Sequence, residues 1–151
     1  MNKYAIEALI AHREPMILIS RLIDFGETHA TCEVDITKDS AFYQPDSNGV
    51  QSYIGIEYMA QAIAAFAGIK ALEQGKPVDI GFLLGSRKYQ CYQTCFKLNE
   101  TYQISIEELY KETSGLSVFE CEISLGEHII AQAKVNAFQP ENPREFLKEQ
   151  Q

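Results

Sequence analysis

The sequence is short of positive charge. Its 151 residues include 13 lysines and arginines against 21 aspartates and glutamates, so the formal net charge is −8. Nucleic acids and anionic membrane surfaces attract proteins through basic patches. This composition therefore argues against nucleic acid or an anionic membrane surface as the main partner. An acidic partner protein would need a local basic patch, and the adjacent residues Arg87 and Lys88 are the candidates for it.

A long uninterrupted apolar segment is missing as well. Residues 1–15 contain neither the apolar core nor the small-residue cleavage site of a secretory signal, so we expect a cytoplasmic protein. The most apolar stretch, residues 53–72, is interrupted by Glu57, Gln61 and Lys70, and the mean hydropathy of the chain is −0.18. A buried helix is therefore expected there, and no membrane span.

The cysteines lack the spacing of a metal site. Cys32, Cys91, Cys95 and Cys121 form no CxxC pair, and no histidine lies near them at zinc-finger spacing. All four fall in segments rich in strand-forming residues. We expect them to be thiols that pack in strands, and we expect no metal site.

What the chain does have is one long helical segment among about six strand-like segments. Turn-forming residues separate these segments, and no repeat or linker divides the chain. An antiparallel sheet that buries one apolar helix against its face is an α+β arrangement, here a single domain over residues 1–151. The pattern predicts a helix at 3–10, strands at 16–25, 28–37, 80–96, 101–112, 116–125 and 128–138, a loop at 38–48, the long helix at 52–72, and a polar tail at 142–151.

The long helix is rich in alanine and carries one carboxylate, Glu57, near its start. Burying an ionised carboxylate without a partner is costly, so we interpret Glu57 as a functional acid whose apolar setting keeps a proton available. The alternative is a water-exposed carboxylate that the helix dipole favours. Gln61 follows one turn later and either orients Glu57 or lies on a partly exposed face. Spacings of three and four predict a buried face made of Ile54, Ile56, Met59, Ala60, Ile63, Ala64 and Ala67.

Three patches of sequence occur in the order and spacing of a known family. They are HREPMILISRLID at residues 12–24, GIEYMAQ at 55–61, and GFLLGSRKYQCYQTCFKLNETYQISIE at 81–107. Together they resemble the hotdog-fold 3-hydroxyacyl-acyl carrier protein dehydratases of fatty-acid and polyene-type synthesis. The resemblance implies a hotdog fold, in which an antiparallel sheet wraps around one long central helix. It also implies a dimer and a lyase that needs no cofactor.

One departure from the family concerns the catalytic base. In the family a histidine takes the α-proton, and the helix acid, here Glu57, protonates the leaving hydroxyl. The residue of this chain that matches the histidine is Tyr43. A phenol is a weak base at neutral pH, so Tyr43 is better suited to donating a hydrogen bond. His12 has a suitable pKa but matches a structural histidine of the family. Asp46 is a third candidate, although it is also an ordinary turn residue.

The resemblance also implies where the substrate binds. Backbone amides at the helix start hold the thioester carbonyl in the family, which corresponds here to Ser52, with Gly55 and Gln61 in the same motif. Arg87 and Lys88 are candidates for the phosphate of phosphopantetheine or for an acidic carrier protein; they could equally be a solvated pair.

Three functions remain open from the sequence. The first is a dehydratase of 3-hydroxyacyl thioesters carried by acyl carrier protein or coenzyme A. The second is a hotdog thioesterase, in which a lone carboxylate suffices and no histidine is required. The third is a non-catalytic hotdog subunit that partners an active dehydratase. We expect a homodimer, or a heterodimer with a second hotdog protein.

Overall fold

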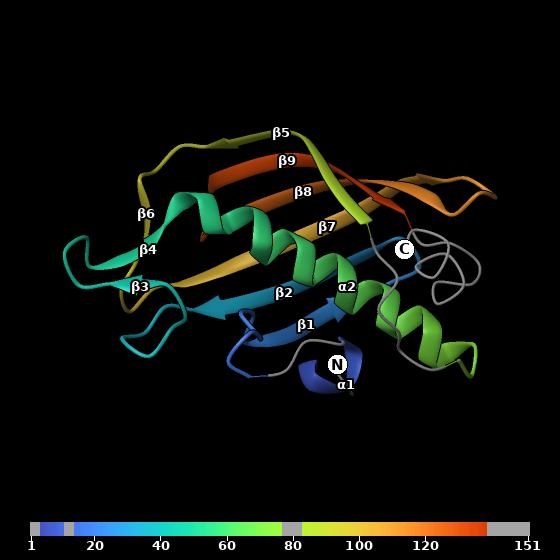
Figure 1. Cartoon of the computed structure of the whole chain (residues 1–151), viewed down its shortest axis with the longest axis horizontal. Helices are drawn as coiled ribbons and strands as arrows, with labels where there is room; N and C mark the ends of the chain where they lie inside the picture. Colours follow the sequence, from blue (N-terminus) through green and yellow to red (C-terminus); the bar gives the residue numbers. More distant parts are fainter. Residues whose placement is uncertain (1–3, 11–13, 77–82, 139–151) are drawn as a thin grey trace, which may run out of the picture.

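The protein is built from a curved antiparallel sheet and one long helix that lies across its concave face (Figure 1). The computed structural model describes residues 4–10, 14–76 and 83–138. The six strands of the main sheet run in the order β1-β2-β7-β8-β9-β5. Their bounds are β1 Arg21–Phe25, β2 His29–Asp35, β5 Leu83–Cys91, β7 Thr101–Lys111, β8 Leu116–Leu125 and β9 His128–Phe138. The predicted α+β arrangement is confirmed.

The remaining elements lie around the two ends of the long helix. A small sheet of β3 (Tyr43–Gln44), β4 (Gly49–Gln51) and β6 (Cys95–Lys97) lies at its N-terminal end (Figure 1). The chain passes from β4 through the 3-10 turn η1 (Ser52–Ile54) directly into α2 (Gly55–Glu73). The short helix α1 (Ile6–Leu9) packs against α2. The turn η1 and α2 together cover the helix predicted at 52–72.

Two predicted strands differ from the structure. The strand expected at 16–25 begins only at Arg21, because the backbone of residues 16–19 is bound to a helix side chain described below. The strand expected at 80–96 divides into β5 and β6, which belong to different sheets. The break comes at Tyr92, whose N–H donates to the carbonyl of Ile130 at 2.9 Å before the chain turns away. The tail expected at 142–151 lies outside the described residues.

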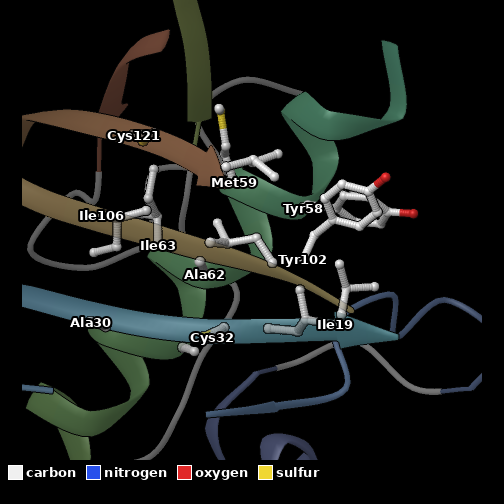
Figure 2. Packing of buried hydrophobic residues seen from close by; sticks show 14 of the residues in the cluster. Ile19, Ala30, Cys32, Tyr58, Met59, Ala62, Ile63, Tyr102, Ile106 and Cys121 are labelled. Carbon is white, nitrogen blue, oxygen red and sulfur yellow. The ribbon is translucent and has the colours of Figure 1, made fainter. Parts of the chain in front are cut away.

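The core lies between α2 and the concave face of the sheet. Figure 2 shows helix residues Tyr58, Met59, Ala62 and Ile63 among the strand residues Cys32, Tyr102 and Ile106. Of the predicted face, Ile54, Met59 and Ile63 are buried, whereas Ile56, Ala60, Ala64 and Ala67 are half-buried. The buried set extends further around the helix, through Tyr58, Ala62, Ala65, Phe66 and Ile69, because α1 and residues 14–19 cover a second side.

A close helix contact depends on one glycine. A Cβ at Gly68 would lie 1.9 Å from the carbonyl oxygen of Leu9, so no larger residue fits while α1 stays in place. This contact explains why a glycine stands in the middle of α2, where it otherwise weakens a helix.

The cysteines pack as predicted. Cys32 and Cys121 are buried in strands, and burial raises the pKa of each thiol to about 12, so both stay protonated at neutral pH. Cys91 and Cys95 are half-buried, and their thiols donate to the carbonyls of Gln93 and Ser47. In the described part of the chain, no cluster of three or more metal-ligating side chains is present. None of the described helices has the length and hydropathy needed for a membrane span.

Candidate active site at the start of the central helix

The first turn of α2 carries Glu57, and its side chain is exposed in the single chain. The prediction of a carboxylate surrounded by apolar side chains is therefore wrong for one chain alone. Among the described residues, no segment covers the side of the helix start that bears Glu57. Two large side chains are also open to solvent: Tyr53, four residues before Glu57, is 63% exposed, and Phe42, next to Tyr43, is 48% exposed. The helix dipole stabilises a carboxylate at this position.

Tyr43, which we predicted to match the position of the family's histidine, lies on β3 at this same end of the helix (Figure 1). It is half-buried on β3 and pairs with Val50 of β4, the strand that leads into η1 and α2. Its hydroxyl donates to Oδ1 of Asn48 at 3.1 Å. The β3–β4 hairpin therefore holds Tyr43 and the helix start in one unit. Asp46, the third candidate base, is exposed in the turn of this hairpin, as its alternative reading as a turn residue predicted.

Gln61 does not serve the substrate. It is only 3% exposed, and its Oε1 accepts hydrogen bonds from the N–H groups of Leu18 at 2.8 Å and Ile19 at 3.4 Å. Its Nε2 donates to the carbonyl of Met16 at 2.7 Å. The prediction that Gln61 orients Glu57 or the thioester is corrected, as is the alternative of a partly exposed face. Gln61 anchors residues 16–19 on the helix, because their backbone groups have no strand partner there.

The amides predicted to hold the thioester carbonyl are already engaged within the chain. The Ser52 N–H donates to the carbonyl of Thr94 at 3.2 Å, and the Gly55 N–H donates to the carbonyl of Ser52. This arrangement corrects the assignment of Ser52 and Gly55 as donors to substrate. Both residues instead build the junction between η1 and α2.

Sequence reasoning missed Tyr89 of β5. Its hydroxyl donates to the carbonyl of Ser52 at 2.6 Å, across 37 positions in the chain. Burial raises the pKa of the phenol, and its neighbour Cys91 adds to the effect, so the hydroxyl stays protonated. The sequence contains one indirect sign of this contact, the glycine at position 55. A Cβ at Gly55 would lie 2.1 Å from the Tyr89 hydroxyl oxygen, so the contact requires a residue without a side chain.

The other predicted site residues lie apart from this group or outside the description. His12 lies outside the described residues, and so does the side chain of Arg87. Lys88 is exposed on β5, beside a register shift between Ser86 and Lys88. Their roles stay predictions.

Arg21, which matches the arginine of the N-terminal motif, has a structural role. It forms ion pairs with Glu33, at 2.6 Å, and with Asp35, both on the neighbouring strand β2. Hydrogen bonding to the guanidinium lowers the pKa of Asp35. Arg21 also lines a cavity of about 540 Å³ between residues 14–21, α1 and the loop after β2; Tyr58 reaches it, but its described lining includes neither Glu57 nor Tyr43.

Comparisons with known proteins decide the family. A family model described as ApeP-like, ApeP dehydratase, matches residues 4–148. The chain belongs to this family. It is similar to the ApeI:P dehydratase heterocomplex from Xenorhabdus doucetiae, with a TM-score of 0.88, 25% identity and 98% of each chain covered. It is also similar to the 3-hydroxyacyl-acyl-carrier-protein dehydratase FabZ of Pseudothermotoga lettingae. The two sequences are 28% identical over 78 residues, and this matched region covers 52% of this chain.

The match to FabZ spans only 55% of that relative's length, about half. An uncharacterized protein from Pyrococcus horikoshii shares the fold at 12% identity, with a TM-score of 0.67 and with 94% of this chain and 98% of that one covered. The predicted hotdog fold and the predicted dehydratase family are thus confirmed. In this ApeP-like chain the helix acid, Tyr43 and the β3–β4 hairpin come together at one end of α2. The described residues show no histidine beside them; His29 and His128 begin strands β2 and β9.

Proposed function

We propose that the chain is the acid-bearing subunit of a dehydratase that removes water from 3-hydroxyacyl thioesters. One observation carries the proposal: Glu57 is an open carboxylate in the first turn of α2, whose other charged residues, Lys70 and Glu73, lie near its far end, in a chain of the ApeP-like dehydratase family. A charged group on such a helix is unusual unless it has a partner or a use. The exposed Tyr53 and Phe42 support a surface that another molecule covers.

The reaction breaks two bonds and forms a double bond. A base takes the proton from the α-carbon, the C–O bond to the β-carbon breaks, and Glu57 gives its proton to the departing hydroxyl, which leaves as water. Covering Glu57 with a second subunit would exclude water from its carboxyl group, and burial disfavours the charged form of a carboxyl. The proton needed by the leaving group is then available at neutral pH.

A second hotdog chain supplies the base in this proposal. Tyr43 already donates its hydroxyl to Asn48, and a phenol is too weak a base at neutral pH. Tyr43 therefore binds the substrate or positions Asn48, and the α-proton goes to a group of the second chain. The similar Xenorhabdus doucetiae structure is a heterocomplex, which supports a heterodimer over the homodimer that the sequence favoured.

Strand β5 is the proposed contact with that second chain. Among the described strands it pairs with β9 alone, so its other edge carries unpaired backbone groups. Lys88 is exposed on this strand, and we propose that it and Arg87 meet the phosphate of the substrate's carrier, acyl carrier protein or coenzyme A.

The test is mass spectrometry of a 3-hydroxyacyl-acyl carrier protein. It is incubated with the purified chain alone, and with the chain co-purified with a second hotdog protein from the same genome. Loss of water only in the second sample is expected. Loss of water with the chain alone would show that a homodimer suffices and contradict the donated base. Release of a free acid would identify a thioesterase, and an intact substrate in both samples would contradict the dehydratase proposal.

A further inference from the structure

The junction between η1 and α2 is attached to the strand-and-turn segment that follows residue 88. The carbonyl oxygen of Ser52 accepts two hydrogen bonds, from the Tyr89 hydroxyl at 2.6 Å and from the Gly55 N–H. The N–H of Ser52 donates to the carbonyl of Thr94, in the turn between β5 and β6. Both polar groups of this residue's backbone therefore have a partner within residues 89–94.

Packing leaves little freedom for this contact. A side chain at Gly55 would meet the Tyr89 hydroxyl oxygen at 2.1 Å and Cζ of Phe96 at 2.9 Å. The helix therefore begins directly against the tyrosine ring. Because burial raises the pKa of Tyr89, its hydroxyl donates throughout the neutral and mildly alkaline range. The bond is thus a permanent feature of the fold near neutral pH.

The position of this bond relates two surfaces of the molecule. Glu57 follows Gly55 by two residues in a rigid helical turn, so the direction of the helix start sets the direction of the carboxylate. Tyr89 belongs to β5, the outer strand of the six-stranded sheet. A shift of β5 against the sheet would therefore act on Ser52 through the hydrogen bond from the tyrosine hydroxyl.

We propose that Tyr89 is a positioning residue that aligns Glu57 with the substrate and makes this alignment depend on the placement of β5. The role rests on the proposed function of Glu57. It extends that function, because a second chain that pairs with the outer edge of β5 would then do two things. It would supply the base, and it would set the position of the carboxylate of Glu57. Small errors in placing a catalytic group cost large factors in rate.

The first test compares Tyr89→Phe with Tyr92→Phe in the complete two-subunit enzyme. Tyr92 is a matched control, because it follows β5 directly but is 59% exposed, and its hydroxyl bonds to the side chains of Gln90 and Gln132. We expect Tyr89→Phe to lower kcat about tenfold or more while KM changes less than about twofold, because the chemical step and not binding is affected. Tyr92→Phe should leave both constants unchanged. Equal kcat in Tyr89→Phe and the parent would overturn the proposal.

A double substitution tests the route through Gly55. Gly55→Ala introduces a methyl group where the Tyr89 hydroxyl lies, so it should lower kcat in the parent. Removing the hydroxyl with Tyr89→Phe removes the closest clash, and the alanine should then cost much less. If the fold-loss of kcat in the double variant equals the product of the losses in the two single variants, Tyr89 does not act through this junction. Gly55→Ala alone also serves as the test if Tyr89→Phe folds poorly.

A readout that needs no activity separates this inference from the proposed function. In amide NMR spectra of the chain, Tyr89→Phe should shift the resonances of residues 52–57, and Tyr92→Phe should not. If the resonances of residues 52–57 shift but the parent enzyme does not dehydrate its substrate, the proposed function is refuted. The role of Tyr89 in aligning Glu57 for that reaction is then refuted as well. Shifts without any loss of kcat in an active enzyme would refute the positioning role alone.

Discussion

The middle of the central helix and one side of its start have opposite surroundings. In the middle of α2, Ala62, Ile63 and Ala65 are fully buried, with the sheet on one side and α1 on another. At its start, Glu57 and the preceding Tyr53 are open to solvent, although Met59 is buried on the sheet side. A helix that is covered in its middle and open on one side of its start marks that side as a contact surface. The four predictions below test this contrast, from the largest expected effect to the smallest.

The covered middle of the helix should not accept a charge. Ile63 is 0% exposed, so Ile63→Asp places an unpaired carboxylate in the core and should lower the free energy of unfolding by about 4 kcal/mol. Leu72→Asp, on the same helix but 38% exposed, should cost less than about 1 kcal/mol. Urea unfolding of both variants gives the comparison. Similar losses would contradict the described burial.

The open side of the helix start should contribute to activity and little to stability. Glu57→Gln keeps the shape of the side chain but removes its transferable proton, so dehydration should slow by about 10²-fold. Thermal midpoints should hardly change, because the carboxylate is exposed. Glu73→Gln, at the far end of the same helix, is the control and should retain full activity. A fall in stability with unchanged activity would make Glu57 a structural residue.

Gln61 follows Glu57 by one turn of the helix but should behave as part of the core. Gln61→Met keeps its volume but leaves the Leu18 N–H and the Met16 carbonyl without their partner, at a cost of about 2 kcal/mol. The exposed Gln74, just past the end of α2, provides the control Gln74→Met, which should be neutral. Differential scanning calorimetry measures both. If Gln61→Met lost activity before stability, the earlier assignment to the substrate would regain support.

An exposed ion pair should matter least. The pKa of Asp35 is lowered by its hydrogen bond to Arg21, so the pair stabilises the fold above the unfolded pKa of the carboxyl. That contribution is lost as the pH falls below about 4. Because the two side chains are 36% and 44% exposed, it should stay below about 1 kcal/mol. The free energies of unfolding of Asp35→Asn and the parent should differ more at pH 7 than at pH 3.

Much of the fold was accessible from local sequence signals. The strands predicted at 101–112, 116–125 and 128–138 agree with β7, β8 and β9 to within about a residue, because alternation and turn residues act over short distances. The strand predicted at 80–96 failed at Tyr92, where a hydrogen bond to the backbone of β9 accompanies the break. Nothing within that segment distinguishes β5 from β6.

The site was less accessible, because its contacts join distant segments. The apolar residues next to Glu57 in the sequence suggested that its side chain is buried. The side chain is exposed, because adjacent residues on a helix point to different sides. Gln61 looked like a substrate ligand, but its partners are 42 to 45 positions away. Tyr89 carried no signal of its own, since only folding brings β5 to the helix start.

By itself, the sequence determined most of the secondary structure and an antiparallel sheet around one helix, because apolar periodicity and turn residues act within short segments. The hotdog fold and the membership of the acid Glu57 in a family motif came from the resemblance to the dehydratase family. Only the tertiary structure decided which side of the start of α2 is open, which backbone groups Gln61 and Tyr89 hold, and which amides of the helix start are already used. Those properties depend on how segments tens of residues apart meet, because burial and hydrogen bonding are set by neighbours in space.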